Sequence, residues 1–506
     1  MPVQLWSTTG EESLRGIPLL YGGLAAIFGY YLYTIIYSAY FHPLAGFPGP
    51  KFRAVSRLPM AASLAQGKFA HDAKALHQKY GSIVRLAPNQ LSFTNPAAWK
   101  DIYGHMNNRP SFQKDRTNYF VPINGVDSIH SACDDAVHAR HRRLLAHAFS
   151  EKALRDQESL MRSYIDLLID KLHKEVQGPK DGKVDIVRWL NYTTFDLIGD
   201  LTFGEPFGCL DNSEYHPWVS IIFESMRAAT IIVGTRQFPS FAALIGRLIP
   251  SAVTQKMRDH FNLSKERMDR RLAMKTDRPD FVTCMLAQKG ERSLAPEELH
   301  SNSPILIIGG SETTATALSA CLYFLNKYPE VYQKLAAEVR TRFTSKDELI
   351  VKNLVELKYM TAVIEETMRI YPPVPGYLPR VAPKEGAHVA GEWIPGGTQV
   401  TIVGLAMAHS PSNYKDPESF VPERWLEGDQ IYASDQKAAH MPFSYGPRNC
   451  IGKNLAWAEM RLLLARLLWE FDIGICEESK NWEVQKTYML WEKPPLIVKL
   501  TPRSGA

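Results

Sequence analysis

The sequence has few cysteines, and they do not cluster. Six cysteines are scattered over 506 residues, and the next one after Cys450 is Cys476. This spread argues against a disulfide scaffold or a multi-cysteine metal site, and it favours a reducing compartment. The chain also lacks a strong charge of either sign, because its net charge is only +5. We therefore expect no nucleic acid partner.

Internal repeats, low-complexity runs and Gly/Ser-rich linkers are also missing from the chain. A chain of 506 residues that is 45% hydrophobic can bury a large core and could hold two or three average domains. Because no linker divides it, one large compact catalytic domain is as good an expectation as several.

Most of the chain has the apolar spacing of helices, at steps of three and four residues. This predicts helices near 137–176, 185–203, 216–232, 252–274, 296–328, 329–343, 353–371 and 455–471. Strand-like patterns are short and predict a hairpin over 82–94 and strands near 378–382, 387–392, 398–403 and 494–500. The stretch 411–447 is rich in Pro, Ser and Asn and predicts an irregular meander. The expected fold is mainly α with small peripheral β-sheets.

One segment departs from a soluble composition, because residues 17–41 contain no charged side chain. As a helix this segment would extend about 37 Å at roughly 1.5 Å per residue, enough to cross a hydrocarbon core of roughly 30 Å. The flank that follows it is the more positive one and contains Lys51, Arg53 and Arg57. This charge bias predicts a body on the cytosolic side of the membrane. The alternative is a buried hydrophobic helix.

These observations divide the chain into four expected parts. We expect a short lumenal N-terminus at 1–16, a single-pass transmembrane anchor at 17–41, a proline-rich linker at 42–57 and a catalytic domain at 58–506. The prolines of the linker stiffen the exit from the membrane.

A single cysteine stands in a glycine-containing loop near the C-terminus. Residues 443–452 read Phe-Ser-Tyr-Gly-Pro-Arg-Asn-Cys-Ile-Gly. A lone thiolate in a tight loop suits the axial ligand of a haem iron. For Cys450 alone, a small buried cysteine in a turn would be the better interpretation. The placement of Phe443, Gly446, Arg448 and Gly452 around it favours the iron ligand.

Two adjacent glycines lie inside an apolar helical stretch. Gly309 and Gly310 cost about 1 kcal/mol each relative to alanine in a helix interior, so a helix that passes close to a flat cofactor would explain them. Glu312 and Thr313 follow, an acid next to a hydroxyl that predicts a proton relay to bound oxygen. The alternative is a kinked helix with a solvated glutamate. Pro304 is expected to kink or restart this helix.

Three further patterns supply buried or cofactor-facing charge. Glu366 and Arg369 lie one helical turn apart, and Arg424 stands in the sequence Pro-Glu-Arg-Trp of the meander. A buried cluster of these three would pin the meander to the helix, provided that every donor and acceptor is satisfied. The turn His-Ala-Arg-His-Arg-Arg at 138–143 is either a basic surface patch or a site for two cofactor carboxylates.

Taken together, these motifs and their order resemble the cytochrome P450 superfamily of haem-thiolate monooxygenases over essentially the whole chain. The segment 443–452 fits the haem-binding signature of that family at every fixed position. The segment 309–314 fits its oxygen-activation motif, 366–369 its helical ion pair and 420–425 its meander motif. The resemblance implies the cytochrome P450 fold in a single large catalytic domain.

The resemblance assigns roles residue by residue. It implies haem b (iron protoporphyrin IX) with Cys450 as metal ligand, and Glu312 and Thr313 as the catalytic proton-delivery pair. Residues similar to those that bind the haem are Phe443, Gly446, Gly452, Gly309 and Gly310, with Arg448, Arg380, Arg142 and His138 at the propionates. His138 stands where many members have tryptophan. Glu366, Arg369 and Arg424 are implied to be structural.

The resemblance also implies partners and a location. Electrons would come from NADPH through NADPH–cytochrome P450 reductase, with cytochrome b5 as a second donor. The protein would sit in the endoplasmic reticulum membrane and face the cytosol. The runs 40–44, 311–316 and 422–426 are similar to those of fungal microsomal hydroxylases of the isotrichodermin hydroxylase type. They imply a lipophilic substrate, a terpenoid or polyketide intermediate of a mycotoxin-like secondary-metabolite pathway that is hydroxylated or epoxidised.

Two other functions compete with a monooxygenase. A non-oxygenating haem-thiolate isomerase or dehydratase would keep Cys450 but would need no acid–hydroxyl relay. A haem-binding sensor or carrier would need neither the relay nor a reductase. The pair Glu312 and Thr313 counts against the isomerase or dehydratase. Substrate-dependent consumption of NADPH with stoichiometric oxidised product would exclude the sensor or carrier.

Overall fold

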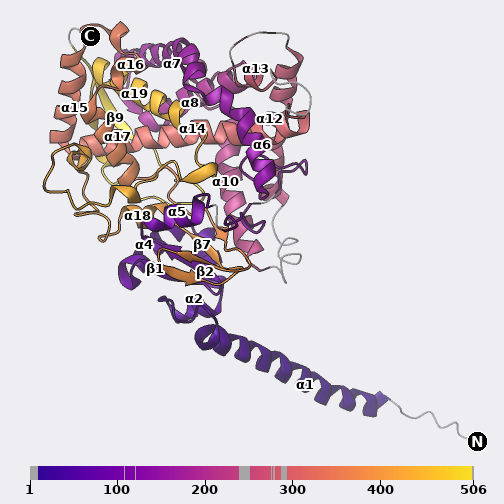
Figure 1. Cartoon of the computed structure of the whole chain (residues 1–506). Helices are drawn as coiled ribbons and strands as arrows, with labels where there is room; N and C mark the ends of the chain where they lie inside the picture. Colours follow the sequence, from indigo (N-terminus) through magenta and orange to yellow (C-terminus); the bar gives the residue numbers. More distant parts are fainter. Residues whose placement is uncertain are drawn as a thin grey trace, which may run out of the picture.

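The computed structural model describes residues 9–106, 109–119, 121–238, 251–274, 276, 278, 280–286 and 293–503. Figure 1 shows a mainly helical body from which one long N-terminal helix projects. This architecture confirms the expected fold class, helical with small sheets. The C-terminus lies on the far side of the body from that helix.

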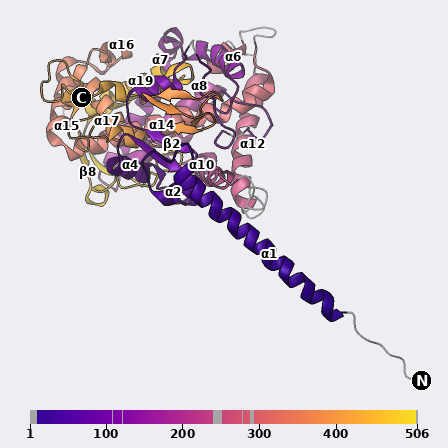
Figure 2. The same cartoon turned by 60° about the horizontal axis from the view of Figure 1, so that its bottom comes forward.

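The projecting helix is α1 (Thr9–Ile36), which runs directly into a π-helical turn, η1 (Tyr37–Phe41). From Tyr21 to Phe41 it is long and apolar enough to span a bilayer, and only 6% of that stretch is buried. Figure 2 shows the same helix leaving the body beside α2 (Lys51–Val55). Of the expected lumenal segment 1–16, residues 1–8 lie outside the described residues.

A buried arginine joins the end of this helix to the body. Arg85, 2% exposed, donates to the carbonyl oxygen of Ser38 at 2.9 Å and to that of Pro88 at 2.6 Å. The Ser38 hydroxyl in turn donates to the carbonyl oxygen of Ala54 at 2.5 Å. The last carbonyls of a helix have no partner within the helix, so Arg85 supplies a cap from a distant strand.

The described residues form three small sheets. The first has the order β1-β2-β7-β4, in which β2 and β7 are parallel and the other pairs antiparallel. The second has the order β3-β9-β8, and the third pairs β5 with β6. The strands are β1 (Ile83–Ala87), β2 (Gln90–Phe93), β3 (Lys183–Asp185), β4 (Arg380–Val381), β5 (Ala387–Val389), β6 (Glu392–Ile394), β7 (Gln399–Thr401), β8 (Phe471–Ile475) and β9 (Ile497–Pro502). The hairpin predicted over 82–94 is confirmed by β1 and β2.

Helices make up most of the body. The longer ones are α3 (Leu58–Ala65), α4 (Phe69–Tyr80), α5 (Ala97–Tyr103), α6 (Asp135–Ala146), α7 (Glu151–Gln177), α8 (Ile186–Phe203), α10 (Pro217–Arg236), α12 (Ser251–Ala273), α14 (Pro296–Lys327), α15 (Pro329–Arg342), α17 (Lys358–Ile370) and α19 (Lys453–Glu470). Shorter turns are η2 (His147–Phe149), α9 (Cys209–Asn212), α13 (Phe281–Leu286), η4 (Lys346–Glu348), α16 (Val351–Leu354), α18 (Gly404–Ala408), η5 (Pro422–Trp425), η6 (Lys437–Ala439), η7 (Gly446–Arg448) and η8 (Glu477–Ser479).

The helix predicted over 137–176 is two helices in the structure, α6 and α7. Ser150 has extended backbone angles, and its hydroxyl accepts a hydrogen bond from the Ala153 N–H at 3.2 Å. A serine cap of this kind starts a new helix, so the apolar periodicity continues while the helix axis does not.

Helix α14 crosses the centre of the body (Figure 1). It is long and apolar enough to span a membrane, yet 72% of that stretch is buried in the protein, as is 50% of α10. It packs against α8, α12, α17 and α19, so both it and α10 are core elements. The core continues into side chains such as Phe195, Leu322 and Leu464, all fully buried.

Pro304 does not restart α14, which runs unbroken from Pro296 to Lys327. A proline at this position cannot donate to the carbonyl of His300, one turn earlier. The Ser303 hydroxyl donates to that carbonyl oxygen at 3.3 Å. A neighbouring side chain thus takes the place of the missing backbone donor, and the predicted restart of the helix is wrong.

Candidate active site

Cys450 lies between η7 and α19 in a loop that closes on itself. The Cys450 N–H donates to the carbonyl oxygen of Phe443 at 2.9 Å, and the Asn449 N–H donates to that of Gly446 at 3.1 Å. The Cys450 side chain is accessible to solvent, although the surrounding protein is close enough to affect its pKa. The surrounding protein raises the pKa of its thiol, and the Gly452 N–H and the charges of Arg142 and Lys453 oppose that rise. Those donors and cations favour a thiolate.

The glycines of this loop have different reasons to be glycine. Gly446 has a φ of 75°, and a Cβ there would lie 2.1 Å from the carbonyl oxygen of Tyr103. Both conformation and space therefore require glycine at this position. A Cβ at Gly452 would lie 3.9 Å from the Phe149 ring and 4.0 Å from the Cys450 sulfur. These are ordinary contacts, so the loop itself does not require glycine there.

One face of α14 is open along its otherwise buried middle. Ile305, Ile308, Gly309 and Thr313 recur at helical spacing and are exposed or half-buried. A Cβ at Gly309 would meet nothing within 4 Å, whereas a Cβ at Gly310 would lie 2.5 Å from Ile198 of α8. Gly309 therefore leaves room on the open face, and Gly310 allows two helices to pack closely. The expectation that both glycines face a flat cofactor therefore fits Gly309, whereas Gly310 faces α8.

The acid and the hydroxyl of the expected relay are not hydrogen-bonded to each other. The Thr313 hydroxyl donates to the carbonyl oxygen of Gly309 at 2.7 Å. Glu312 is fully buried, and its carboxylate forms an ion pair with Lys493. Adjacent residues on a helix do not face each other, which explains why the two side chains have different neighbours.

Lys114, Arg380 and Arg448 lie near Tyr119 and form a cationic group. Lys114 Nζ lies 4.4 Å from the centre of the Tyr119 ring. Burial lowers the pKa of Lys114, and the charges of Arg380 and Arg448 lower it further. Burial and the same cations, Arg448 first, lower the pKa of His138 to about 3, so His138 is neutral. This mutual repulsion indicates a site with more positive charge than its own carboxylates balance.

The four predicted propionate ligands are not equivalent in the structure. Arg142 donates to the Asn449 carbonyl oxygen at 2.5 Å and to its side-chain oxygen at 2.7 Å. Arg448 is paired with Asp135 at 2.8 Å and donates to two backbone carbonyls. Both arginines therefore hold the cysteine loop. Arg380 and His138 are buried without a carboxylate partner among the described residues.

These residues fit a haem. Buried Arg380 Nε and the Tyr119 hydroxyl have no hydrogen-bond partner among the described residues, so this cationic group lacks acceptors. Two carboxylates would supply them. The thiol of Cys450 offers one ligand to iron, and the glycine-thinned face at Gly309 offers space for a flat ring.

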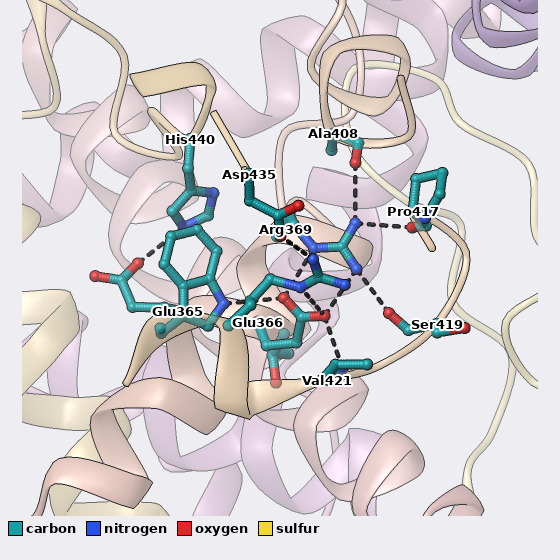
Figure 3. Close-up of polar contacts among 12 residues, drawn as sticks. Glu365, Glu366, Arg369, Ala408, Pro417, Ser419, Val421, Asp435 and His440 are labelled. Atoms are coloured by element: carbon teal, nitrogen blue, oxygen red, sulfur yellow. Dashed lines mark hydrogen bonds and ion pairs between the residues drawn. The ribbon is translucent and has the colours of Figure 1, made fainter. Parts of the chain in front are cut away.

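The predicted ion pairs meet in a fully buried cluster (Figure 3). Arg369 binds both oxygens of Glu366 at 2.8 Å, and Arg424 Nε binds Glu366 at 3.1 Å. Arg369 also donates to the carbonyl oxygens of Ala408, Pro417 and Ser419. Arg424 pairs in addition with Asp435. The cluster thus links α17 to the meander, through Arg369 of the helix and through Arg424 of the meander.

Four charged residues in these arrangements were not predicted from the sequence: Lys114, Asp135, Asp435 and Lys493. Each lies outside a recognisable motif, and each meets its partners through tertiary contacts. The one local signal is Asp435, an acid within a meander that already supplies a buried arginine. Lys114 and Lys493 had no such signal, because their flanking residues resemble an ordinary solvated loop.

The chain is similar to a known family over almost its whole length. A family model for cytochrome P450 matches residues 48–500. The cytochrome P450 monooxygenase astJ of Aspergillus oryzae is 44% identical over 478 residues, which cover 94% of this chain and 95% of that protein. The cytochrome P450 monooxygenase astA of Talaromyces wortmannii is 43% identical over 485 residues, covering 96% and 97%. The trichothecene C-15 hydroxylase of Fusarium sporotrichioides is 43% identical over 499 residues, covering 97% and 100%. On this coverage, the chain belongs to the cytochrome P450 family of monooxygenases.

Proposed function

We propose that this monooxygenase hydroxylates or epoxidises a lipophilic small molecule, a terpenoid or polyketide intermediate of a fungal secondary-metabolite pathway. The observation that carries the proposal is Cys450, an exposed thiol inside the fold with cations beside it. The relative named as a trichothecene C-15 hydroxylase supports a hydroxylation reaction. Half-buried Ile305 and Ile308 on the open face of α14 support an apolar substrate.

The chain's own residues would hold haem b as follows. Cys450 would supply the thiolate ligand of the haem iron, while Arg142 and Arg448 hold the loop that carries it. Arg380 and His138 would bind the propionates, and we add Lys114 to them because it lies in the same cationic group. Bound haem with thiolate ligation supplies the activation of dioxygen.

The remaining chemistry is proton control and exclusion of water. The Thr313 hydroxyl lies on the open face of α14, where it would hold a proton for the reaction. Glu312 supplies the acid of the relay. The apolar side chains of the same face keep bulk water away from the substrate.

Electrons would come from NADPH through NADPH–cytochrome P450 reductase, with cytochrome b5 as a second donor. Exposed Lys453 directly follows the cysteine loop, and exposed Arg143 is next in sequence to Arg142, which bonds that loop; both support docking of an acidic partner surface. Arg140, which belongs to the same basic turn, is paired with Glu298 and is less available.

An isotope experiment tests the reaction class. A host strain that lacks this gene should accumulate a precursor, and that precursor should be incubated with the holoenzyme, reductase, NADPH and ¹⁸O₂. One ¹⁸O atom in the product, with strict dependence on NADPH, is the expected result. Conversion without NADPH and without ¹⁸O would indicate the isomerase or dehydratase, and binding without conversion would indicate the sensor or carrier.

We also propose that residues 17–41 anchor the protein in the endoplasmic reticulum membrane, with residues 58–506 on the cytosolic side. The exposed apolar helix Tyr21–Phe41 supports the anchor. Deletion through Phe41 should move the protein into the soluble fraction after alkaline carbonate extraction. Continued tight association would contradict a single anchor and reveal a second membrane contact.

A further inference from the structure

The lysine that pairs with Glu312 has no place in the function proposed above. Lys493 lies between the Thr487–Trp491 bridge and β9, and its Nζ forms an ion pair with the Glu312 carboxylate. The two side chains are 2% and 0% exposed. The same Nζ donates to the Thr316 hydroxyl at 2.7 Å, which donates to the Glu312 carbonyl oxygen at 2.7 Å. Glu312 is therefore held at both its side chain and its backbone.

The ion pair involves only one oxygen of the Glu312 carboxylate, Oε1. Glu312 Oε2 is buried and has no hydrogen-bond partner among the described residues. Leaving a buried carboxylate oxygen without a partner costs free energy, so stability alone does not explain this arrangement. The Thr313 hydroxyl is meanwhile bonded to Gly309 within its own helix. The acid of the relay is thus separated from the hydroxyl that it must supply.

Lys493 reaches Glu312 from the protein surface. Its neighbours Glu492, Pro494 and Pro495 are exposed, while its own side chain extends inward. Burial lowers the pKa of Lys493 to about 7, and the adjacent carboxylate favours the charged form. Two residues earlier, Trp491 stacks on Tyr371 with ring centres 4.0 Å apart, and this contact orients the segment that carries Lys493 while the ion pair is closed.

We propose that Lys493 is a positioning residue that holds Glu312 out of the proton relay until the segment 487–493 moves. When the ion pair separates, the buried carboxylate takes a proton from water, because an unpaired charge at this depth is costly. Neutral Glu312 then donates that proton toward Thr313 and returns to the carboxylate that Lys493 binds. The inference rests on the proposed monooxygenase function and deepens it.

The moving segment has a contact point for substrate. Met489 stands at its tip and is 43% exposed, and the Tyr488 N–H donates to the Leu490 carbonyl oxygen at 2.9 Å across that tip. A lipophilic substrate that packs on Met489 displaces the segment that carries Lys493. Proton delivery then depends on whether substrate is bound, and the enzyme does not consume NADPH to reduce oxygen when the site holds no substrate.

Substrate-free NADPH consumption tests this coupling without knowledge of the substrate. Holoenzyme with reductase is compared for the wild type, Lys493→Met, Lys493→Arg and the double variant Glu312→Gln/Lys493→Met. Lys493→Met should raise consumption several-fold, because Glu312 is released permanently. Lys493→Arg keeps the charge and should match the wild type. The double variant, which has no acid to release, should consume less NADPH than Lys493→Met.

A spectroscopic readout separates this role from a purely structural one. The C–O stretching frequency of the reduced carbonyl complex responds to charge and hydrogen-bond donors beside the bound ligand. It should shift in Lys493→Met and shift less in the double variant, which has no carboxylate to release. Lys493→Gln keeps a donor toward Thr316 without the charge, and it should show the same shift where Lys493→Met yields too little holoenzyme.

Two different failures are distinguishable. Unchanged or lower NADPH consumption in both Lys493→Met and Lys493→Gln, with an unshifted C–O frequency, overturns the inference while the wild-type spectrum upholds the proposed function. A wild-type carbonyl complex without the red-shifted Soret band of thiolate ligation would instead overturn the proposed function itself.

Discussion

Two sets of buried polar groups in this protein differ in how completely their hydrogen bonds are satisfied. In the cluster around Glu366, both carboxylate oxygens accept hydrogen bonds, and Arg369 donates to Glu366 and to three carbonyl oxygens. Around the cysteine loop and α14, Arg380 Nε, the Tyr119 hydroxyl and Glu312 Oε2 have no partner among the described residues. A saturated cluster stabilises the fold, whereas an unsaturated one keeps binding capacity for a cofactor or a proton.

Removal of Arg369 should have the largest effect, because the saturated cluster has nothing to replace it. Arg369→Met would leave three buried carbonyl oxygens without their donor and would weaken the hold on Glu366. We expect a loss of about 3–5 kcal/mol in the free energy of unfolding, enough to abolish the yield of folded holoprotein. The measurement is the haem content of the soluble or detergent-extracted fraction. A variant that folds normally would remove the contrast between the two clusters.

Removal of Cys450 should abolish the chemistry while it leaves the fold. In Cys450→Ala the backbone bond from residue 450 to Phe443 remains available, and the side chain makes no buried contact that the fold needs. The reduced carbonyl complex should lose its red-shifted Soret band completely, while the circular dichroism of the protein stays that of the wild type. Retention of the band would contradict the assignment of Cys450 as ligand.

Removal of the Thr313 hydroxyl should change how electrons are used and leave their supply intact. Thr313→Ala removes the one hydroxyl on the open face next to Gly309. We expect several-fold more hydrogen peroxide per NADPH consumed, measured with the natural substrate and reductase. Thr313→Ser, which keeps the hydroxyl, is the matched control and should behave as the wild type. Equal peroxide yields in both variants would argue against a relay through Thr313.

The smallest expected effect is a pH-dependent change in thermal stability when Glu459 is replaced. It lies on α19 beside Thr314 of α14, and burial raises its pKa to about 8. A carboxyl whose folded-state pKa is raised stabilises the protein at low pH, and that stability is lost as the pH rises from the unfolded-state pKa to about 8. Glu459→Gln stays neutral, so its thermal midpoint should exceed that of the wild type by more at pH 8 than at pH 5. An equal difference at both pH values would show that Glu459 is not neutral in the folded protein.

The sequence predicted those parts of the fold that repeat over many residues. The long apolar periodicities of 185–203 and 296–328 became α8 and α14, because a helix that is apolar all round belongs in a core. The helices α2 to α5 were missed. For α2, α3 and α5 the reason is that five to eight residues carry too little periodicity to recognise, whereas α4 was missed over twelve residues. The strands of the first sheet were predicted, as a hairpin over 82–94 and as strands near 378–382 and 398–403. Their pairing was not, because β7 joins β2 from far along the chain.

At the site, the sequence identified side chains but not their partners. Cys450 and Thr313 sit in local motifs whose glycines and neighbours carry the signal. Glu312 was expected to be free for the relay, and its pairing with Lys493 depends on a tertiary contact that no local pattern encodes. Likewise, Arg142 was expected at a propionate, yet its donors are used by Asn449.

The cap that Arg85 provides has a mechanical consequence. Its guanidinium bonds the last turn of the projecting helix to the strand hairpin, so the proline-rich exit is a stiff joint and not a loose tether. A force that bends the helix would therefore act on the first sheet, to which β1 and Arg85 belong. If α1 is the membrane anchor proposed above, the orientation of the catalytic body relative to the membrane depends on this arginine as well as on the length of the connecting chain.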